Sequence, residues 1–467
     1  MTHDSRTTGP GDLFLCWRGT AHDGHLFLEE AVARGAVAAV VERPVPDVRV
    51  PLLRVRNGRR AAALVADAFF DSPWEDLFVA AVTGTNGKTT TALLSRHLLG
   101  LREPCAALGT LGLVETDGTP RPDSGALTTP GPVEVARTLR ELRDQGVHSV
   151  VLEASSHALE QHRLDGIRFD AAVFTNLSQD HLDYHESQEA YLRAKGRLVE
   201  LLAATGTRVV NGEDPAWLQL PSHPGPVLRY RVNQDGTDGS REGEPLVARD
   251  LEMGPGGSSF ILEFRGERQP VRLPLLGRFN VENALGAVGV VLARGGSLEE
   301  AARGLAEAPQ LAGRLEVVTQ REFAVVVDFA HTPAALERVL ETLKPLFPGR
   351  LIVVFGAGGD RDPGKRAPMG RVAAEWADLA IVTSDNPRTE DPEAIVRQIA
   401  EGMEGTDHEE IVDRRLAIQR ALDLAKSGDV VLLAGKGHER FQQVGEERRP
   451  FHEPEIVAEL LASGERR

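Results

Sequence analysis

The residues whose types and spacing point most directly to chemistry lie in one short segment of the chain. An almost continuous apolar run, Leu77 to Val82, is typical of a strand buried on both faces of a parallel sheet. A turn rich in glycine follows it, and from Thr89 onward the residues are good helix formers. In such a unit the turn amides and the helix N-terminus face a phosphate, Lys88 supplies a charge, and the Thr89 hydroxyl can ligate Mg²⁺. The segment therefore predicts a site for nucleotide phosphates.

This turn departs from the strict P-loop pattern at one position. The strict pattern carries a glycine five residues before its second glycine, where this chain has Val82. Two interpretations follow: a chance Gly-Lys-Thr sequence, or a distinct class of nucleotide loop. The strand before the turn and the helix after it favour the second interpretation, because both are needed to present turn amides to an anion.

Polar clusters follow the next two predicted strands. The strand Ser149 to Leu152 leads into Glu153, and the strand Phe169 to Phe174 leads into a polar run that contains His181. Open α/β sheets bind their ligands at the carboxyl ends of the strands, and a carboxylate near a phosphate loop is a natural Mg²⁺ ligand. Lys195 lies on a predicted helix over 187–203, and a lone helical lysine by itself indicates no role. The two clusters predict an active site.

Four more strands with polar ends are predicted in the last third of the chain. They cover Ala324 to Asp328, Leu351 to Phe355, Leu379 to Thr383 and Val430 to Ala434. In one parallel sheet the turns after these strands would meet at a single edge. Basic residues on the turns are expected to give that edge positive charge for an anionic ligand, namely Arg361, Lys365, Arg366, Arg388 and Lys436.

The alternation of strands and helices predicts an α/β fold with a largely parallel, doubly wound sheet. The length of 467 residues suggests about three domains. We expect a small N-terminal α/β domain over 1–75, a central nucleotide-binding domain with a P-loop-type, mostly parallel sheet over 76–312, and a C-terminal Rossmann-like domain over 313–467. Residues 232–245 form a polar, glycine-rich stretch beside a predicted hairpin with strands within 258–266 and 269–277.

Composition narrows the class of protein. The net charge of −16 argues against a general nucleic-acid binder and against adhesion to anionic membranes. Two cysteines, Cys16 and Cys105, predict a reducing compartment without a disulfide framework. The polar N-terminus does not have the layout of a signal peptide, and no apolar run approaches the length of a membrane span. We expect a cytoplasmic protein.

The residues alone leave several chemistries open. A Mg-nucleotide loop and a second α/β domain with basic turns fit phosphoryl transfer from ATP to a carboxylate, with the second domain delivering an acceptor. They also fit a kinase or a nucleotide-driven switch.

Longer motifs around these residues resemble the Mur ligases of peptidoglycan precursor synthesis. They are TGTNGKTTT, LEASSHALEQHR, FTNLSQDHLDYH, YLRAK, GRFNVENALGA, LAGRLE, VVDFAHTP, FGAGGDRDPGKR, SDNPRTEDP and AGKGHE, which together cover essentially the whole chain. Within the family, SSHALEQHR and the DNPR and GKGHE pair resemble the branch that adds the third residue. That branch joins a diamino acid to UDP-N-acetylmuramoyl-L-alanyl-D-glutamate.

The resemblance implies a role for each matching residue. It implies ATP binding by Thr83, Gly84, Thr85, Asn86, Gly87, Lys88, Thr89, Asn280, Arg314, Asp328 and His331. It implies binding of the UDP-precursor by Ser5, Thr20, Ala21, His22, Thr128, Thr129, Ser155, Gln161 and Arg163. It implies an amino-acid pocket of Arg361, Asp385, Asn386, Pro387, Arg388, Gly435 and Glu439. It implies Mg²⁺ ligation by Thr89, Glu153, His181 and a CO₂-derived carbamate on Lys195, with Lys88, Glu153, His181 and Lys195 as the catalytic set.

The resemblance also implies a two-step reaction by a monomeric enzyme. ATP phosphorylates the D-glutamate γ-carboxylate, and the amine of the diamino acid then displaces phosphate from the acyl phosphate. Arg388 favours meso-diaminopimelate, because a guanidinium can pair with its distal carboxylate in a planar, bidentate arrangement. Lysine and ornithine, which lack that carboxylate, are the alternatives.

Three competing assignments are distinguished by the same motifs. A folate polyglutamate ligase would resemble GTNGKGS in the loop and would lack DNPR. The Mur ligase that adds D-alanyl-D-alanine would lack the SSHALEQHR and GKGHE combination. A non-catalytic nucleotide-binding regulator would not need Lys88, Glu153, His181 and Lys195 together, and this chain has all four.

Overall fold

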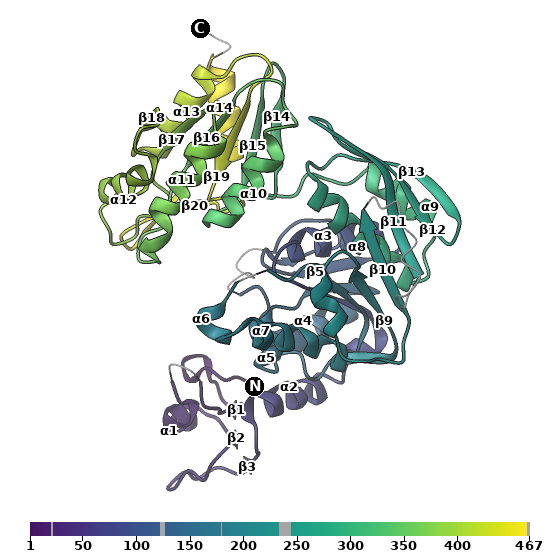
Figure 1. Cartoon of the computed structure of the whole chain (residues 1–467). Coiled ribbons are helices and arrows are strands. Elements are labelled where there is room, and N and C mark those ends of the chain that lie inside the picture. Colours follow the sequence, from purple (N-terminus) through teal and green to yellow (C-terminus); the bar gives the residue numbers. More distant parts are fainter. Residues whose placement is uncertain (20–21, 122–126, 179, 233–243, 465–467) are drawn as a thin grey trace. The chain divides into compact units, whose positions relative to one another are not determined.

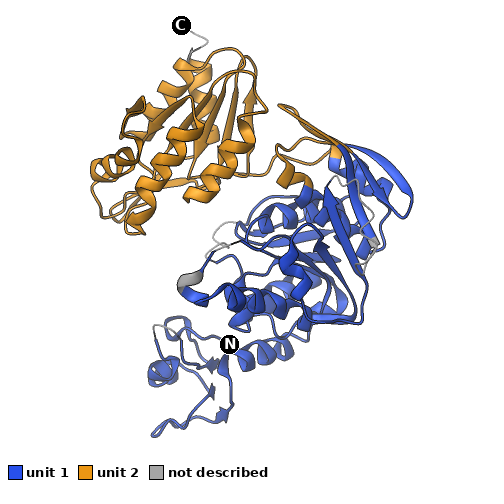
Figure 2. Cartoon of the chain, viewed as in Figure 1, with its two compact units in different colours: residues 1–250, 261–271, 282–305 blue, residues 251–260, 272–281, 306–467 orange. Residues whose placement is uncertain are grey.

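The computed structural model describes residues 1–19, 22–121, 127–178, 180–232 and 244–464 (Figure 1). The chain divides into two compact units (Figure 2). Unit 1 comprises residues 1–250, 261–271 and 282–305, and unit 2 comprises residues 251–260, 272–281 and 306–467. The strands of the described residues form four sheets, of three, ten, six and two strands.

The N-terminal part of unit 1 is a small α/β layer. Its parallel strands are β1 (Leu13–Leu15), β2 (Ala38–Val41) and β3 (Leu52–Arg54), and its helices are α1 (Leu28–Ala33) and α2 (Gly58–Phe69). Phe14 and Leu28 lie in the core on one side of the strands, whereas Leu15 and Ala62 lie in a separate core on the other. Neighbouring residues of β1 therefore point to opposite faces, as expected of a strand.

The largest sheet forms the centre of the fold and is mostly parallel in its described pairs. In spatial order its strands are β13 (Glu267–Leu273), β12 (Gly257–Phe264), β11 (Glu244–Gly254), β10 (Val227–Val232), β9 (Leu202–Asn211), β8 (Phe169–Phe174), β4 (Phe78–Thr83), β7 (Ser149–Glu153), β5 (Cys105–Gly109) and β6 (Gly112–Val114). The helices in this part of the chain are α3 (Lys88–Gly100), α4 (Pro132–Asp144), α5 (Ser156–Glu160), α6 (Leu182–His185), α7 (Gln188–Gly196), α8 (Arg278–Ala293) and α9 (Leu298–Ala306).

The strand β4 lies in the middle of this sheet, between β8 and β7. Every residue of β4 is buried, which explains its continuous apolar sequence. Thr83 pairs with Phe174, and Val82 pairs with Glu153. The three strands therefore end level with one another, and the turns that follow them share one edge of the sheet.

Unit 2 contains a six-stranded sheet with helices on both faces. In spatial order its strands are β14 (Glu316–Gln320), β15 (Ala324–Asp328), β19 (Val430–Ala434), β16 (Leu351–Phe355), β17 (Leu379–Val382) and β18 (His408–Glu410), parallel except for the pair β14–β15. The helices are α10 (Pro333–Leu343), α11 (Arg366–Trp376), α12 (Pro392–Ala400), α13 (Arg414–Leu424) and α14 (Glu453–Gly464), and β20 (Phe441–Val444) pairs with β21 (Glu447–Pro450) in a hairpin.

Alternate residues of these strands line two separate cores. Val326 and Val353 pack with residues of α10, α11 and α12, whereas Val325 and Ile352 pack with residues of α13 and α14. Figure 1 shows the helices on the two sides of this sheet. The arrangement is the doubly wound α/β layer that the alternating sequence predicts, and the α/β prediction with a mostly parallel central sheet is confirmed.

The local predictions hold for the strongly apolar strands and fail where the sequence is mixed. The predicted strands at 169–174, 324–328, 351–355 and 430–434 match β8, β15, β16 and β19. The predicted helix over 187–203 was wrong at its end, because α7 stops at Gly196 and β9 begins at Leu202. Most of the loop predicted over 232–245 lies outside the described residues.

Both cysteines are buried and free. Burial raises the pKa of the Cys16 thiol to about 12 and also raises that of Cys105. Within the described ranges, no helix combines the length and apolar character needed to cross a membrane.

Candidate active site

The predicted phosphate loop connects β4 to α3 at the carboxyl edge of the central sheet. Gly84 and Gly87 have positive φ angles of 149° and 83°, which side chains disfavour. A Cβ atom would also collide with the Thr175 hydroxyl at Gly84 and with the Asn283 amide at Gly87. Both glycines are therefore required by the conformation of the loop.

Two lysines converge on a single carbonyl of this loop. Lys88 donates from Nζ to the carbonyls of Gly84 at 3.0 Å and Thr85 at 2.8 Å. Lys195, which comes from α7, donates to the same Gly84 carbonyl at 2.7 Å. The structure thus brings the predicted catalytic lysines together at the position where phosphate oxygens are expected.

Lys195 is only 1% exposed. Its Nζ lies 4.3 Å from the centre of the Tyr191 ring. Burial, followed by the charge of Lys88, lowers the pKa of Lys195 well below its ordinary value. A buried amine with a lowered pKa is more readily neutral, and a neutral amine is the form that can react with CO₂.

Glu153, at the end of β7, joins the loop to a neighbouring turn. Its Oε2 atom accepts hydrogen bonds from the hydroxyls of Thr89 at 3.0 Å and Thr110 at 3.1 Å. Its Oε1 atom accepts from the Thr110 amide at 2.8 Å. The predicted pair of oxygen ligands, Thr89 and Glu153, is therefore in direct contact.

The geometry of this pair fits Mg²⁺. Octahedral Mg²⁺ binds oxygen at about 2.0–2.1 Å, so two adjacent ligands lie about 3 Å apart. The separation of 3.0 Å between Thr89 Oγ1 and Glu153 Oε2 matches that edge. An oxygen-rich carbamate on Lys195 would suit the same hard cation.

His181 lies in a cluster of rings that reaches the site through Tyr191. It is exposed, with 47% of its side chain accessible, and its φ angle is 52°. Its ring centre lies 4.9 Å from that of His157 and 6.2 Å from that of Tyr191. Among the described residues, no three His, Cys, Asp or Glu side chains form a group that could hold a metal. The structure therefore brings Thr89 and Glu153 together without adding His181.

Four of the residues predicted to bind the UDP-precursor form one network beside Glu153. The Thr129 hydroxyl donates to the Glu153 carbonyl at 2.7 Å and accepts from the Ser155 amide at 3.0 Å. Arg163 donates to the Thr129 carbonyl at 2.6 Å and to Gln161 Oε1 at 2.8 Å. Ser155 also caps α5 through the Ala158 amide, at 3.2 Å, which explains why a serine begins that helix.

Among the described residues, the other predicted precursor residues make no hydrogen bond with these four. The Thr128 hydroxyl lies 3.3 Å from the Thr110 hydroxyl, next to Glu153. His22 is exposed in the N-terminal layer, with its ring centre 6.3 Å from that of Phe27. Thr20 and Ala21 lie outside the described residues.

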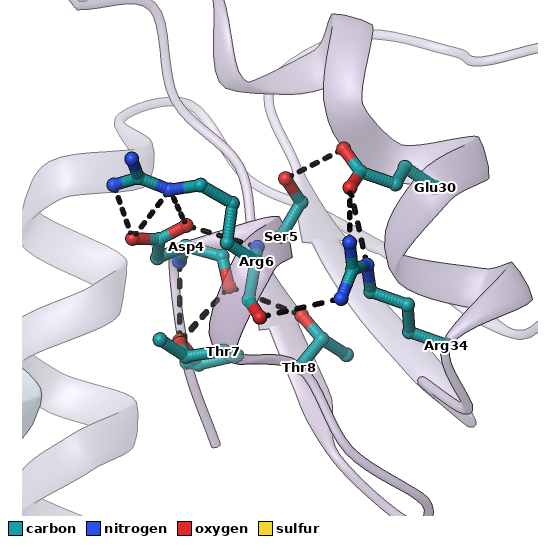
Figure 3. A network of polar contacts seen from close by, with 8 residues as sticks. Asp4, Ser5, Arg6, Thr7, Thr8, Glu30 and Arg34 are labelled. Carbon is teal, nitrogen blue, oxygen red and sulfur yellow. Dashed lines mark hydrogen bonds and ion pairs between the residues drawn. The ribbon is translucent and has the colours of Figure 1, made fainter.

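Ser5 is held in the N-terminal polar network of Figure 3. Its hydroxyl donates to Glu30 Oε2 at 2.9 Å, and Glu30 forms an ion pair with Arg34. Arg34 also donates to the Arg6 carbonyl at 3.4 Å. The helix α1 thus fixes the segment that carries Ser5.

In unit 2, the turns after β17 and β19 meet. Asn386 Nδ2 donates to Glu439 Oε2 at 2.8 Å, and Lys436 Nζ lies 3.1 Å from both that oxygen and Asn386 Oδ1. A Cβ on Gly435, whose φ angle is 115°, would lie 2.6 Å from Asp385 Oδ2. Four predicted amino-acid ligands are therefore close together: Lys436 joins Asn386 to Glu439, and the Asp385 side chain packs against Gly435.

Arg388 adopts a left-handed conformation with φ at 50°. Its guanidinium donates to the Gly359 carbonyl at 2.5 Å, which ties the DNPR turn to the turn after β16. Arg361 lies exposed on that second turn, while Pro387 is buried. The backbone amide of Arg388 donates to the Gln443 carbonyl at 3.2 Å.

The nucleotide residues predicted in unit 2 differ in exposure: Asn280 is buried, Arg314 and Asp328 are half-buried, and His331 is exposed. Asn280 donates to the Leu276 carbonyl at 2.9 Å on α8. Asp328 accepts from the amides of Leu315 and Ala330, both at 2.8 Å, and burial raises its pKa.

The two remaining residues predicted to bind ATP, Arg314 and His331, lie against the aromatic ring of Phe329. The Arg314 guanidinium lies 5.3 Å from its centre, and the rings of His331 and His438 lie 4.7 and 5.1 Å away. Desolvation by the surrounding protein lowers the pKa of His331 and lowers that of His438 to about 4. Both shifts favour the neutral imidazole.

The prediction that Arg366 and Lys436 give the edge of this sheet positive charge for an anionic ligand was wrong. Arg366 and Lys436 are buried, and they pair with Glu390 at 2.9 Å and Glu439 at 3.1 Å. Their charges are compensated inside the protein, because burying an unpaired charge is costly.

Sequence analysis missed three contributors to these sites. Thr110 supplies two hydrogen bonds to Glu153, and its position after a short apolar strand could have indicated it. Phe329 and Gln443 carry no sequence signal of their own, because their roles depend on turns that meet only in the folded chain.

Comparison with known proteins gives a consistent result. Family models match residues 1–70 as "Mur ligase family, catalytic domain", residues 82–291 as "Mur ligase middle domain" and residues 313–437 as "Mur ligase, glutamate ligase domain".

The chain is also similar to named proteins over nearly its whole length. It is 44% identical to the UDP-N-acetylmuramoyl-L-alanyl-D-glutamate–2,6-diaminopimelate ligase of Geobacillus kaustophilus, over 97% of this chain and 93% of that protein. It is 44% identical to the protein of the same name from Bradyrhizobium diazoefficiens, over 98% and 94%. A solved structure of a ligase with this name has a TM-score of 0.72 at 35% identity, over 99% of this chain and 94% of that one. A MurF ligase from Thermotoga maritima in complex with ADP shares the fold, with a TM-score of 0.66 at 19% identity, over 100% and 98%.

Proposed function

The chain belongs to the Mur ligase family, and we propose from its site that it is an ATP-dependent amide ligase. It adds meso-diaminopimelate to UDP-N-acetylmuramoyl-L-alanyl-D-glutamate and so makes the UDP-MurNAc-tripeptide of peptidoglycan synthesis. Relatives that are 44% identical over their length carry that activity in their names.

One observation carries the proposal: Glu153 contacts both the phosphate loop and the network of predicted UDP-precursor residues. Its carboxylate contacts Thr89 of the phosphate loop at 3.0 Å. Its backbone carbonyl contacts Thr129 of the precursor network at 2.7 Å. A γ-phosphoryl group on the loop and a carboxylate in the network would therefore meet at Glu153, as transfer between them requires.

The reaction proceeds in two steps. A carboxylate oxygen of the D-glutamate side chain attacks the γ-phosphorus of ATP, the bond to ADP breaks, and an acyl phosphate forms. The neutral amine of diaminopimelate attacks the acyl carbon, loses a proton, and expels inorganic phosphate. Lys88 holds the phosphates and offsets the charge of the two reacting anions, which is mainly positioning and electrostatic stabilisation.

We propose that Mg²⁺ is held by Thr89, Glu153, His181 and a carbamate on Lys195. When bound, the cation neutralises charge that develops on the transferred phosphoryl group. Thr110 holds the Glu153 carboxylate through two hydrogen bonds and so orients it toward the loop. His181, on an exposed segment, must approach Glu153 to complete the set.

The specificity proposal rests on Arg388. Its guanidinium lies on the same turn as Asp385 and Asn386, where the amine and α-carboxylate of an amino acid would bind. Meso-diaminopimelate offers a second carboxylate for the planar fork, and lysine and ornithine do not.

We further propose three functional segments, 1–75 for the UDP-precursor, 76–312 for ATP and 313–467 for the amino acid. The ends of the three family matches support these boundaries. We propose that the enzyme acts in the cytoplasm as a monomer. We also propose that it has no nucleic-acid or membrane partner, and its net charge of −16 supports this second proposal.

The test is phosphate release in the presence of ATP, UDP-precursor and one of meso-diaminopimelate, lysine or ornithine. Of the three amino acids, we expect only meso-diaminopimelate to give rapid phosphate release. We expect this release to require both the UDP-precursor and the amino acid. Faster turnover of lysine or ornithine would overturn the specificity. No release with any amino acid, while ATP still binds, would favour a nucleotide-binding regulator.

A further inference from the structure

A fully buried ion pair lies behind the turns that carry the proposed amino-acid ligands. Arg414 is the first residue of α13 and Glu453 is the first residue of α14, and both side chains are 0% exposed. Arg414 Nε donates to Glu453 Oε1 at 2.8 Å. Removing two charges from water is costly, so a buried pair of this kind is poor evidence of a stabilising role. We therefore look for its role in the other contacts that Arg414 makes.

The remaining donors of Arg414 reach the ends of two different strands. Nη2 donates to the carbonyl of Ala434, the last residue of β19, at 2.9 Å. Nη1 lies 3.4 Å from the carbonyl of Ser384, which follows β17. The residues that come next in the chain are Gly435 and Asp385, both proposed ligands. One guanidinium therefore sets the distance between the two turns at the point where each begins.

The turns have little room to shift at this point. A Cβ on Gly435 would meet the Asp385 carboxylate at 2.6 Å, so the Asp385 side chain packs directly against the Gly435 backbone. Further along, the Lys436 ammonium group bonds Asn386 and Glu439 across the same gap. A small change in the spacing of the turns would move the proposed ligands relative to one another.

Glu453 serves as an acceptor for Arg414. Its second oxygen, Oε2, is buried and has no hydrogen-bond partner in the described part of the chain. The carboxylate thus holds the guanidinium in one orientation, and its other interactions are electrostatic, with Lys436 and Asp385. Because Glu453 is the first residue of α14, this helix helps to hold Arg414 behind the proposed amino-acid site.

We propose that Arg414 and Glu453 are positioning residues for the amino-acid site, which fix the two ligand-bearing turns at the spacing that a zwitterionic diamino acid requires. This inference rests on the proposed function. Neither residue touches the substrate. Their effect is on the affinity for the amino acid, and the affinities for ATP and for the UDP-precursor do not depend on them.

The chain provides a matched control on the same two helices. Arg415 of α13 and Glu459 of α14 form an ion pair at 2.8 Å, with 46% and 63% of their side chains exposed. Exposed pairs of this kind contribute little to stability. Arg415→Lys and Glu459→Gln therefore alter an ion pair between the same two helices without affecting the turns.

The experiment measures the KM values of all three substrates, kcat and Tm for the full-length enzyme and four variants. Arg414→Lys retains the charge but loses the planar fork, and we expect its KM for meso-diaminopimelate to rise about tenfold. We expect Glu453→Gln to raise that KM about threefold, since it retains an acceptor for Arg414 but not the charge. The other two KM values should stay within about twofold, and the control variants should match the wild type.

Each outcome decides between defined alternatives. A lower Tm or kcat with an unchanged KM for meso-diaminopimelate in both Arg414→Lys and Glu453→Gln would overturn the inference, because it would indicate a purely structural pair. If Arg414→Lys does not fold, Glu453→Gln alone decides by the same criterion. If the wild type turns over no diamino acid, the proposed function fails and the inference fails with it.

Discussion

Two lysines of this chain are equally buried but are held in opposite ways. Lys195 in unit 1 donates to a neutral carbonyl, that of Gly84. Lys436 in unit 2 donates to the carboxylate of Glu439. Burial and the nearby charge of Lys88 lower the pKa of Lys195 well below its ordinary value. The charge of Lys436, in contrast, is compensated within the fold.

The difference indicates two strategies for building a site. The phosphate loop keeps two lysines on a backbone carbonyl, and a phosphate oxygen can replace that carbonyl as their acceptor. The amino-acid turns are cross-linked by the hydrogen bonds that join Asn386 to Lys436 and Glu439 before any ligand arrives. The first site is prepared to receive an anion and CO₂, whereas the second is preorganised for a ligand of fixed shape.

The largest effect is expected from Lys88→Ala, which removes the charge on the loop. Loss of a group that stabilises developing charge lowers rates by about 10²- to 10³-fold. We expect phosphate release to fall by about 10³-fold, while binding of meso-diaminopimelate, measured by calorimetry, is unchanged. A matching loss of amino-acid binding would show that the two sites are not prepared independently.

The next effect concerns the cross-linked site. Lys436→Met leaves the Glu439 carboxylate without its buried partner, and removing one member of a buried pair costs about 3 kcal/mol or more. We expect urea denaturation to show a loss of about 3 kcal/mol in the free energy of unfolding. Retention of wild-type stability would mean that Lys436 does not hold the turns.

Arg388→Asn tests specificity without straining the backbone, because asparagine tolerates the left-handed conformation at this position. Removing a bidentate contact to a carboxylate should lower kcat/KM for meso-diaminopimelate about 100-fold, or about 2.7 kcal/mol. Turnover of lysine should change little. An equal loss for both amino acids would indicate that Arg388 holds the turn and does not select the ligand.

Lys195→Met should have the opposite effect on stability from Lys436→Met. Removing an amine that is buried beside a neutral carbonyl should stabilise the protein by about 1–2 kcal/mol at pH 7 and abolish activity. The Lys195 pKa is lower in the folded state than its ordinary value of 10.5, so the unfolded chain takes up the proton first as pH falls.

The stability of the wild type should therefore decrease as pH falls from about 10.5 toward the pKa of folded Lys195, and the variant should lack this component. Denaturation at pH 7 and pH 10 measures the difference. A stabilisation that is the same at both pH values would contradict the role assigned to burial of the amine.

The sequence predicted the parts of these sites that local pattern determines. Strand β4 is apolar from Phe78 to Val82 because both its faces are buried, and the loop after it carries glycines where φ is positive. These signals lie within a few residues of one another, so they can be recognised without the fold.

The rest depends on contacts between distant segments. Nothing near Lys436 distinguishes a buried lysine from a surface one, and its pairing with Asn386 appears only when β17 and β19 end at one edge. The same holds for Thr110, whose partner Glu153 is 43 residues away. The helix predicted through residue 203 was wrong because strand β9 pairs with β8, a tertiary contact that overrides local helix propensity.

The burial of both cysteines has a practical consequence. With Cys16 and Cys105 covered and their thiol pKa values raised, neither is reactive toward alkylating dyes. A cysteine introduced at exposed Leu101 in unit 1 and another at exposed Leu416 in unit 2 would be the thiols that take up fluorophores. The two native cysteines therefore need not be replaced before single-molecule distance measurements that follow the two units through a catalytic cycle.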